Sequence, residues 1–418
     1  MLGRVWATRQ HMVIVRMRRT TAVMVWGLSI LCGATLQAQN RIDGDGFAQR
    51  EQLAQHSSPL LEGLTAAAFN DTAKAEKFLP PLIAAAPQSA AAAQARQALA
   101  FLYFRQGLYR QALRWIDSAF AAGPDDANLR GMKVLVGQLA THPDQQSTTV
   151  PSSAAAHLRE GNIFVAVRAN GLPGEYILDS GANISLISES EARRLGMKVE
   201  TVNGSLAATG AIDSTFPYRL AVLDRLEIGD ARLRNVGFMV VSDDQQPFVE
   251  MLEGQRAILS IPVLLGLRTM RLRPGSEQLD IGFASQPLQY DQANLCFEGA
   301  LPLLLASFQG KAIRLVFDTG SARTDFWPKF GTNYPDYIAS HGHKGSRQVR
   351  GVDGSKQFDS VILDEVSLEI AGRTVLLRPA HVIPEPKDSP LHGRLGMDAL
   401  GLAKSLTIDW SAMRLTLE

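Results

Sequence analysis

Apolar positions follow two different patterns along the chain. From about residue 47 to residue 140 they are rich in Ala and Leu and recur with helical spacing, without strand-like alternation. After residue 158 the pattern changes to short apolar or alternating runs separated by turn residues, at residues 163–167, 176–178, 220–228 and 236–241. The sequence therefore predicts a multidomain α and β chain, with an all-α domain over residues 45–140 and an all-β region after it.

The predicted helical domain contains two stretches with a similar order of small and apolar residues. The second stretch has Leu99, Ala100, Tyr103, Gly107, Tyr109, Ala112, Ala119 and Pro124, and the first has Gly63, Ala66, Ala75, Leu82 and Pro87. This order resembles tetratricopeptide repeats, in which small residues let two antiparallel helices pack and a proline ends the second helix. An unspecialised alanine-rich helical domain is the alternative.

The segment over residues 141–158 separates the two regions. It is polar, contains two prolines and shows no periodicity, so it is predicted to be a linker. The β region beyond it divides into residues 160–285 and residues 292–418. Within the first half, the pair Asn170-Gly171 between two apolar runs predicts a hairpin, and residues 189–195 predict one short helix.

The two halves of the β region repeat one motif, in which a turn pair and an apolar strand lead into an Asp-Ser/Thr-Gly sequence and a small residue. The motif reads Asp179-Ser180-Gly181-Ala182 in the first half and Asp318-Thr319-Gly320-Ser321 in the second. The aspartates lie 318 − 179 = 139 residues apart. A second repeated segment covers residues 257–264 and 393–400, and its matching residues Ser260 and Gly396 lie 396 − 260 = 136 apart. Strand-like segments follow at residues 270–281 and 406–417. Repetition of this extent predicts two similar lobes.

Residues 176–196 (Tyr-Ile-Leu-Asp-Ser-Gly-Ala-Asn-Ile-Ser-Leu-Ile-Ser-Glu-Ser-Glu-Ala-Arg-Arg-Leu-Gly) resemble the retropepsin-type aspartyl peptidases of bacteria. Two such halves in one chain also resemble the pepsin arrangement, and the resemblance covers residues 160–418. It implies an acid-protease fold with an aspartate from each lobe in a catalytic pair, Asp179 and Asp318, acting on a polypeptide substrate. It also implies that the hydroxyls of Ser180 and Thr319 hydrogen-bond across the lobe junction.

Elementary chemistry explains why such a pair needs these residue types. Two carboxylates about 3 Å apart cannot both ionise cheaply, so they share one proton, and the ionised member acts as a base on water. Gly181 and Gly320 would let the two loops approach each other. Ala182 and Ser321 must be small so that they can pack beneath these loops. As a hypothesis, the Ser321 hydroxyl stabilises an ionised Asp318 and leaves the shared proton on Asp179.

Each lobe is expected to carry a flap hairpin over the cleft. The predicted tips contain Gly210, Ala211 and Ile212 in the first lobe and Val352, Asp353 and Gly354 in the second, where Asp353-Gly354 is a favourable turn pair. Such flaps would bind an extended peptide by main-chain pairing.

Two departures from the family pattern keep alternatives open. Ser260 stands where the family has glycine, and the segment 323–327 brings an arginine and an extra carboxylate close to the second motif. One alternative is an inactive peptide-binding scaffold, with the helical repeats as a surface for a protein partner. Another is hydrolysis confined to one cognate protein or to the chain itself, cut in the linker.

Composition and short motifs narrow the possible partners, cofactors and location of the protein. Lys and Arg (42) nearly balance Asp and Glu (41), which gives no indication of a nucleic-acid partner. His341 and His343 form a His-Gly-His sequence, but no spaced Cys or acidic partner completes a metal site, so neither metal nor cofactor is predicted. Residues 1–38 contain a basic stretch and an apolar run and predict a cleaved signal for export to the periplasm or the medium, with a retained anchor as the alternative.

Overall fold

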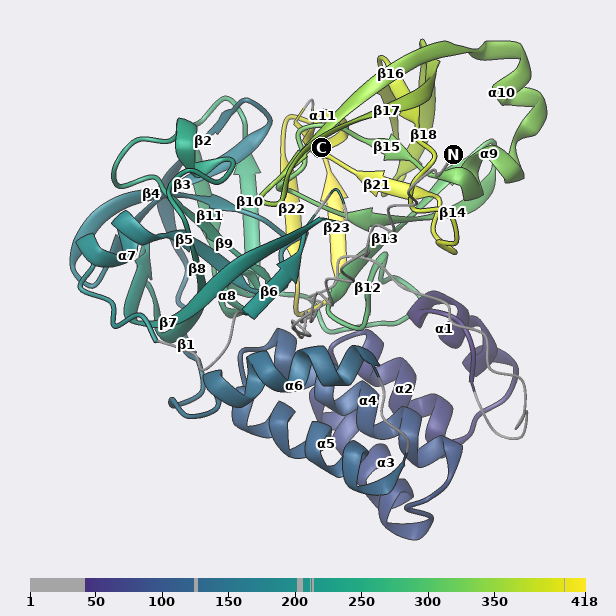
Figure 1. Cartoon of the computed structure of the whole chain (residues 1–418). Coiled ribbons are helices and arrows are strands. Elements are labelled where there is room, and N and C mark those ends of the chain that lie inside the picture. Colours follow the sequence, from purple (N-terminus) through teal and green to yellow (C-terminus); the bar gives the residue numbers. More distant parts are fainter. Residues whose placement is uncertain (1–41, 124–126, 201–205, 211, 213, 402) are drawn as a thin grey trace, which may run out of the picture.

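The structure is a computed structural model that describes residues 42–123, 127–200, 206–210, 212, 214–401 and 403–418. A layer of helices lies against two β-rich lobes, and the order along the chain is helices first, then the first lobe, then the second (Figure 1). The predicted order of an α domain before a β region is confirmed. The predicted signal, residues 1–38, lies outside the described residues.

The helical domain places six helices in the described residues 42–140. They are α1 (Gly46–Gln55), α2 (Pro59–Ala68), α3 (Thr72–Ala85), α4 (Ala90–Arg105), α5 (Tyr109–Ala122) and α6 (Ala127–Leu139). The first four helices begin after Asp45, Ser58, Asp71 and Ser89, whose side chains each accept a hydrogen bond from the amide three residues on. These residue types are the preferred helix N-caps, so the sequence itself sets where these helices start.

The helices α4 and α5 cover the stretch of the second sequence repeat. Leu99, Ala100 and Ala112 are fully buried, and Gly107 between the helices has a positive φ of 72°, which glycine adopts without strain. The described chain is therefore helical where the pattern predicts helices. Its assignment to the tetratricopeptide class stays a prediction.

Arg105 ties the helical domain to the second lobe. Its side chain is buried, its Nη1 donates to the Gly299 carbonyl at 2.9 Å, and its Nη2 donates to the Ala67 carbonyl on α2. Its guanidinium also lies 4.5 Å from the ring centroid of Phe297 in the second lobe. Since one buried cation bridges α2, α4 and the lobe, the helical domain is docked on the β region.

The first lobe is built mainly from strands. They are β1 (Gln146–Thr148), β2 (Ser152–Arg159), β3 (Asn162–Ala169), β4 (Leu172–Leu178), β5 (Ser185–Ser188), β6 (Leu206–Thr209), β7 (Thr215–Ile228), β8 (Ala231–Val241), β9 (Ala257–Leu259), β10 (Thr269–Arg273) and β11 (Gln278–Ile281). The predicted hairpin at Asn170-Gly171 is confirmed, with both residues at positive φ and Ala169 paired with Leu172. Helix α7 (Glu189–Arg194) confirms the predicted short helix.

The second lobe is also built mainly from strands. They are β12 (Leu295–Glu298), β13 (Leu301–Phe308), β14 (Lys311–Phe317), β15 (Asp325–Phe326), β16 (Gly342–Gly351), β17 (Gly354–Leu363), β18 (Val366–Ile370), β19 (Arg373–Leu377), β20 (Ala380–Val382), β21 (Gly393–Leu395), β22 (Leu406–Asp409) and β23 (Arg414–Leu417). Its last two strands leave the lobe, because β22 pairs with β10 and the two lobes thereby share one sheet (Figure 1).

The structure corrects the predicted linker. Within residues 141–158, β1 pairs with β8 and β2 pairs with both β3 and β11, so the first lobe begins well before residue 160. The buried residues of β2 in this stretch are the small Ala154 and Ala156. Alanine and serine carry little intrinsic strand preference, and long-range pairing rather than local propensity makes this strand.

The β region also contains more helix than predicted. Besides α7 it has η1 (Phe248–Glu250), α8 (Ile261–Leu267), α9 (Pro328–Asn333), α10 (Pro335–His341) and α11 (Met397–Leu400). Each is short, and α8, α9 and α10 begin with a proline in their first turn, a position where proline needs no hydrogen-bond donor. None of the helices in the described part of the chain combines the length and the apolar character that crossing a bilayer requires.

Replacing Arg105 with Met is expected to lower the free energy of unfolding by about 2–4 kcal/mol, because it removes the hydrogen bonds that the buried guanidinium donates to the Ala67 and Gly299 carbonyls and to Asn70 Oδ1. Urea unfolding of the full chain measures the change. The control is Arg114→Met, which alters an exposed arginine on α5. Equal effects of the two substitutions would contradict the docking role of Arg105.

Candidate active site

The two repeated aspartates lie in equivalent loops that meet between the lobes. Asp179 follows β4, which runs parallel to β9, and its amide donates to the Leu259 carbonyl at 2.9 Å. Asp318 follows β14, which runs parallel to β21, and its amide donates to the Leu395 carbonyl at 3.1 Å. Matching strand pairs therefore hold both loops at the same position in their lobes.

The residues after the aspartates bind the loops to each other. The Ser180 hydroxyl donates to the Phe317 carbonyl at 2.8 Å and accepts from the Thr319 amide at 3.0 Å. In return, the Thr319 hydroxyl donates to the Leu178 carbonyl at 2.9 Å and accepts from the Ser180 amide at 2.9 Å. Both side chains are buried, so these four hydrogen bonds are shielded from water and fix the distance between the loops.

Each glycine of the motif lies against the aspartate of the opposite lobe. A Cβ atom on Gly181 would stand 2.5 Å from Asp318 Cγ, and one on Gly320 would stand 2.3 Å from Asp179 Cγ. The Gly181 amide also donates to Asp179 Oδ1 at 2.7 Å, and the Gly320 amide donates to Asp318 Oδ1 at 3.0 Å. Only glycine leaves room for the two carboxylates to face each other here.

Burial and the neighbouring negative charge make Asp179 a weak acid. Burial first, and the Asp318 carboxylate second, raise the pKa of Asp179 from 3.8 to about 8, against the opposing effect of the Gly181 amide. At neutral pH the raised pKa of Asp179 favours the protonated form of this carboxyl group.

Ser260 fits the first lobe without displacing the loop. It is buried, its amide donates to the Ser185 hydroxyl at 3.1 Å, and the two hydroxyls lie 3.0 Å apart. The equivalent Gly396 amide donates to the Thr324 hydroxyl at 3.0 Å, where a Cβ on Gly396 would stand 2.5 Å from backbone atoms of Arg323. Ser260, which stands where the family has glycine, is thus accommodated by its hydrogen bonds with Ser185.

The Ser321 hydroxyl has a different partner from the one hypothesised. It donates to the Arg323 carbonyl at 2.8 Å. Its own amide donates to the Asp318 carbonyl, and its carbonyl accepts from the Met397 amide at 2.8 Å, as the Ala182 carbonyl accepts from the Ile261 amide at 3.1 Å. The hypothesis that this hydroxyl stabilises an ionised Asp318 is wrong for this structure.

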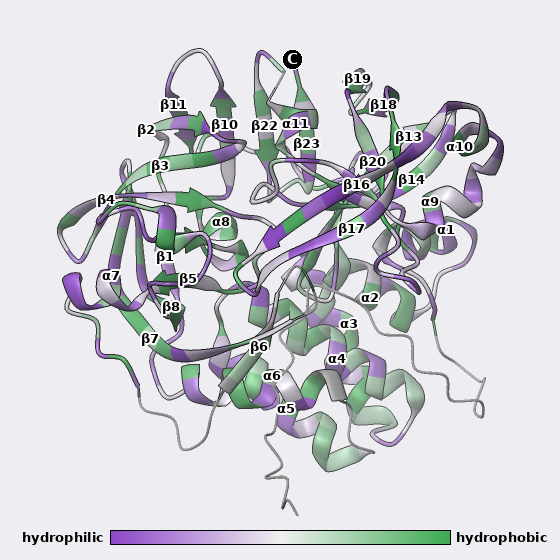
Figure 2. Cartoon of the chain, turned by 45° about the horizontal axis from the view of Figure 1, so that its top comes forward, coloured by the Kyte–Doolittle hydropathy of each residue, from purple (hydrophilic) through white to green (hydrophobic). Residues whose placement is uncertain are grey.

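The two predicted flap hairpins meet at their tips. In the first, β6 pairs with β7, and in the second, β16 pairs with β17 up to Gly351 and Gly354. Asp353 Oδ2 at the second tip accepts from the amides of Ile212 at 3.0 Å and Ser214 at 3.1 Å. Figure 2 shows the long β16–β17 hairpin reaching from its lobe toward the other. Gly210 and Ile212 lie in this contact, whereas Ala211 lies outside the described residues.

A group of three charged residues extends from Asp318, and none of them was among the predicted site residues, although the sequence had indicated an extra carboxylate in segment 323–327. Arg394 Nη1 lies 3.5 Å from Asp318 Oδ2, and Arg394 Nη2 lies 3.5 Å from Asp325 Oδ2. Arg347 of β16 also binds Asp325. The repeated segments carry a signal for this group, because Arg394 stands where the first lobe has Ile258, two residues before the Ser260 position.

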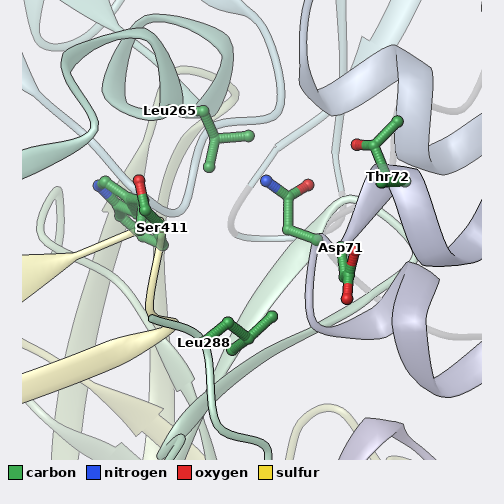
Figure 3. A pocket seen from close by; sticks show the side chains of 8 residues that line it. Asp71, Thr72, Leu265, Leu288 and Ser411 are labelled. Atoms are coloured by element: carbon green, nitrogen blue, oxygen red, sulfur yellow. The ribbon is translucent and has the colours of Figure 1, made fainter. Parts of the chain in front are cut away.

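A pocket away from the aspartates lies where the helical domain meets the lobes. Leu265 and Leu288 from the β region face Asp71 and Thr72 of the helical domain across it (Figure 3). Neither aspartate of the repeated motif lines this pocket, so it is separate from the candidate active site.

Replacing Asp179 with Asn is expected to stabilise the fold most at neutral and higher pH. Folded Asp179 keeps its proton up to about pH 8, whereas an aspartate in the unfolded chain loses it near pH 4. The folded state therefore binds more protons, and stability falls as the pH rises from about 4 to 8. The melting temperature of Asp179→Asn should exceed that of the parent by about 5 °C more at pH 8 than at pH 4.

Thermal unfolding at pH 4, 6 and 8 measures this difference. Asp291→Asn, which changes an exposed aspartate, serves as the control and should show no such trend. A constant difference across the three pH values for Asp179→Asn would refute the assignment of the proton.

Replacing Asp353 with Ala is expected to loosen the flap contact. Hydrogen bonds to a charged acceptor contribute about 1.5–3 kcal/mol, so exchange of the Ile212 and Ser214 amides should accelerate about tenfold or more. Hydrogen exchange followed by mass spectrometry measures it, with Asp359→Ala on the exposed side of the same hairpin as the control. Unchanged exchange in Asp353→Ala would show that the carboxylate does not hold the tips together.

Comparison with known proteins gives one matching family and many similar solved structures, of which two are described. Residues 165–267 match the family described as "Aspartyl protease". A retropepsin-like aspartic protease from Rickettsia conorii is 16% identical over 34% of this chain and 95% of that one, with a TM-score of 0.23. An aspartic proteinase from Irpex lacteus is 13% identical over 65% of this chain and 96% of that one, with a TM-score of 0.38.

No curated protein matches the chain. The family match contains Asp179 and the first flap hairpin, and it supports an aspartyl protease fold and a protease-like function for this region.

Proposed function

We propose that the protein is an aspartic endopeptidase whose catalytic residues are Asp179 and Asp318. The observation that carries the proposal is the buried pair of loops in which each glycine admits the carboxylate of the opposite lobe. Structural aspartates in turns do not need a reciprocal set of hydroxyl bonds between lobes. Forcing two carboxylates together costs stability, and this cost is typical of a catalytic site.

The two carboxyl groups would divide the reaction between them. Asp318, ionised, takes a proton from a water molecule, and the water oxygen attacks the carbonyl carbon of the scissile bond. Asp179, protonated, donates a hydrogen bond and then its proton to the carbonyl oxygen, which gives a neutral tetrahedral diol. When the C–N bond breaks, the leaving nitrogen takes the proton held by Asp318, a diol hydroxyl returns its proton to Asp179, and the pair is restored.

We infer further that the two lobes are copies of one ancestral unit. Matching features of both lobes support this. Each lobe has a hairpin turn with two positive φ angles, followed by a strand (β4 or β14) that runs parallel to a later short strand (β9 or β21). In each lobe, a hydroxyl also accepts a hydrogen bond from the amide that follows the short strand. Since one chain carries both lobes, it supplies both carboxylates of the proposed dyad.

The flap hairpins support a polypeptide as the substrate class. An extended chain placed between the flaps and the dyad would offer its backbone to strands of both hairpins, which is a sequence-tolerant mode of recognition. The contact between Asp353 and the first flap would have to open to admit such a chain. A protein partner on the helical domain and export beyond the cytoplasm stay predictions of the sequence.

The full chain is expected to cleave a diverse library of unstructured peptides. Asp179→Asn and Asp318→Asn should each lower kcat/KM by at least about a thousandfold, because each removes one of the two proton-transfer groups. Since Asp179 must keep its proton, cleavage by the parent should fall as the pH rises through about 8. Mass spectrometry of the products from about pH 3 to 9 measures both effects.

Two control measurements test whether each variant is folded and whether it binds peptides. If either substitution left cleavage intact in a folded protein, the dyad assignment would be overturned. Peptide binding of equal strength by all three proteins, without any cleavage, would instead identify a binding scaffold.

A further inference from the structure

The two carboxylates of the proposed dyad have unequal surroundings. Asp318 Oδ2 lies 3.5 Å from the guanidinium of Arg394, whose side chain is only 17% exposed. We propose that Arg394 is a positioning residue that keeps Asp318 ionised and so leaves the shared proton on Asp179. This inference rests on the proposed function, because it assigns the roles of base and acid within the dyad.

Arg394 is held in place by a second, fully buried carboxylate. Its Nη2 lies 3.5 Å from Asp325 Oδ2, and β15 and β21 pair with Asp325 directly opposite Arg394. Because the side chain of Asp325 has no exposed surface, it needs cationic partners to stay ionised. The backbone register thus fixes the guanidinium between Asp325 and the dyad.

Arg347 leaves the charge of Arg394 available to Asp318. Its Nε donates to Asp325 Oδ1 at 2.7 Å, and its Nη2 donates to Asp325 Oδ2 at 3.3 Å, so it already forms a bidentate pair with that carboxylate. One arginine therefore balances Asp325. The second arginine of the group, Arg394, supplies the positive charge that an ionised Asp318 requires.

Other titratable groups lie near this cluster. Asp398 on α11 accepts a hydrogen bond from the Thr324 hydroxyl at 2.7 Å. His381 on β20 has its pKa lowered by burial and by Arg347, so it is neutral at neutral pH. Arg323, in the chain between Asp318 and Asp325, adds a positive charge near the same histidine. Asp179, across the junction, has a raised pKa, which favours its neutral form.

At the strand position that matches Arg394, the first lobe has an apolar residue. Its β5 and β9 pair Leu186 with Ile258, in the same register as Asp325 with Arg394, and both residues are apolar and buried. A desolvated carboxyl beside apolar side chains favours its neutral form, whereas one beside a guanidinium favours its charged form. The fold brings two chemically identical groups together, and the difference between Ile258 and Arg394 separates their roles.

The test compares three substitutions in the full chain: Arg394→Gln, which removes the charge, Arg394→Lys, which keeps it, and Ile258→Gln at the matching position of the first lobe. An arginine beside an aspartate lowers the pH of its ionisation by about 1–3 units. The acidic limb of the pH profile of kcat/KM should therefore move upward by about 1–3 units in Arg394→Gln. It should stay within a few tenths of a unit in Arg394→Lys and Ile258→Gln. Asp325 keeps Arg347 in every variant, which preserves the buried ion pair.

A second readout does not depend on cleavage. The ¹³Cγ resonance of Asp318, identified by its loss in Asp318→Asn, reports ionisation directly and should move its midpoint upward in Arg394→Gln only. An unmoved midpoint and an unmoved acidic limb in folded Arg394→Gln would overturn the proposal, as would equal shifts in Ile258→Gln. If the resonance shifts while no variant and no parent protein cleaves peptides, the role of Arg394 stands and the proposed function fails.

Discussion

The architecture depends on the four hydrogen bonds by which Ser180 and Thr319 bind the two aspartate loops to each other. These bonds hold Asp179 and Asp318 so close together that a negative charge on one carboxyl group disfavours ionisation of the other. The shared sheet formed by β10 and β22 ties the lobes together independently of these loops, so the fold does not have to be held by the carboxylates themselves. The stability of the shared sheet therefore offsets the cost of placing two carboxyl groups together, as is common at functional positions.

The two lobes also differ from each other near the two aspartates. The lobes match in their turn geometry and in their amide-to-hydroxyl contacts at Ser185 and Thr324, but they differ at one matching strand pair, which is Leu186 with Ile258 in the first lobe and Asp325 with Arg394 in the second. Arg394 gives Asp318 a cationic neighbour, whereas the first lobe has the apolar Ile258 at the matching strand position. A two-lobed chain can vary one side of its site alone, which a symmetric pair of identical subunits cannot do.

The helical domain is part of this assembly rather than an appendage. Arg105 is buried between α2, α4 and the turn after β12, and Arg50 of α1 donates to the carbonyls of Tyr290 and Ala293 in the connection between the lobes. Docking therefore places the helices against the second lobe and the connection, and also against α8 and β7 of the first lobe (Figure 1).

The sequence by itself determined the parts that depend on local patterns: the capped helices, the Asn170-Gly171 hairpin, the repeated aspartate motif and the flap hairpins. It did not predict β2, because small residues form that strand only when β3 and β11 flank them. Nor did it identify Arg394 beside Asp318 or the true partner of Ser321, since those contacts join residues through strand register and loop geometry. Local propensity specified the elements and the chemistry, and tertiary pairing decided which charge faces which carboxylate.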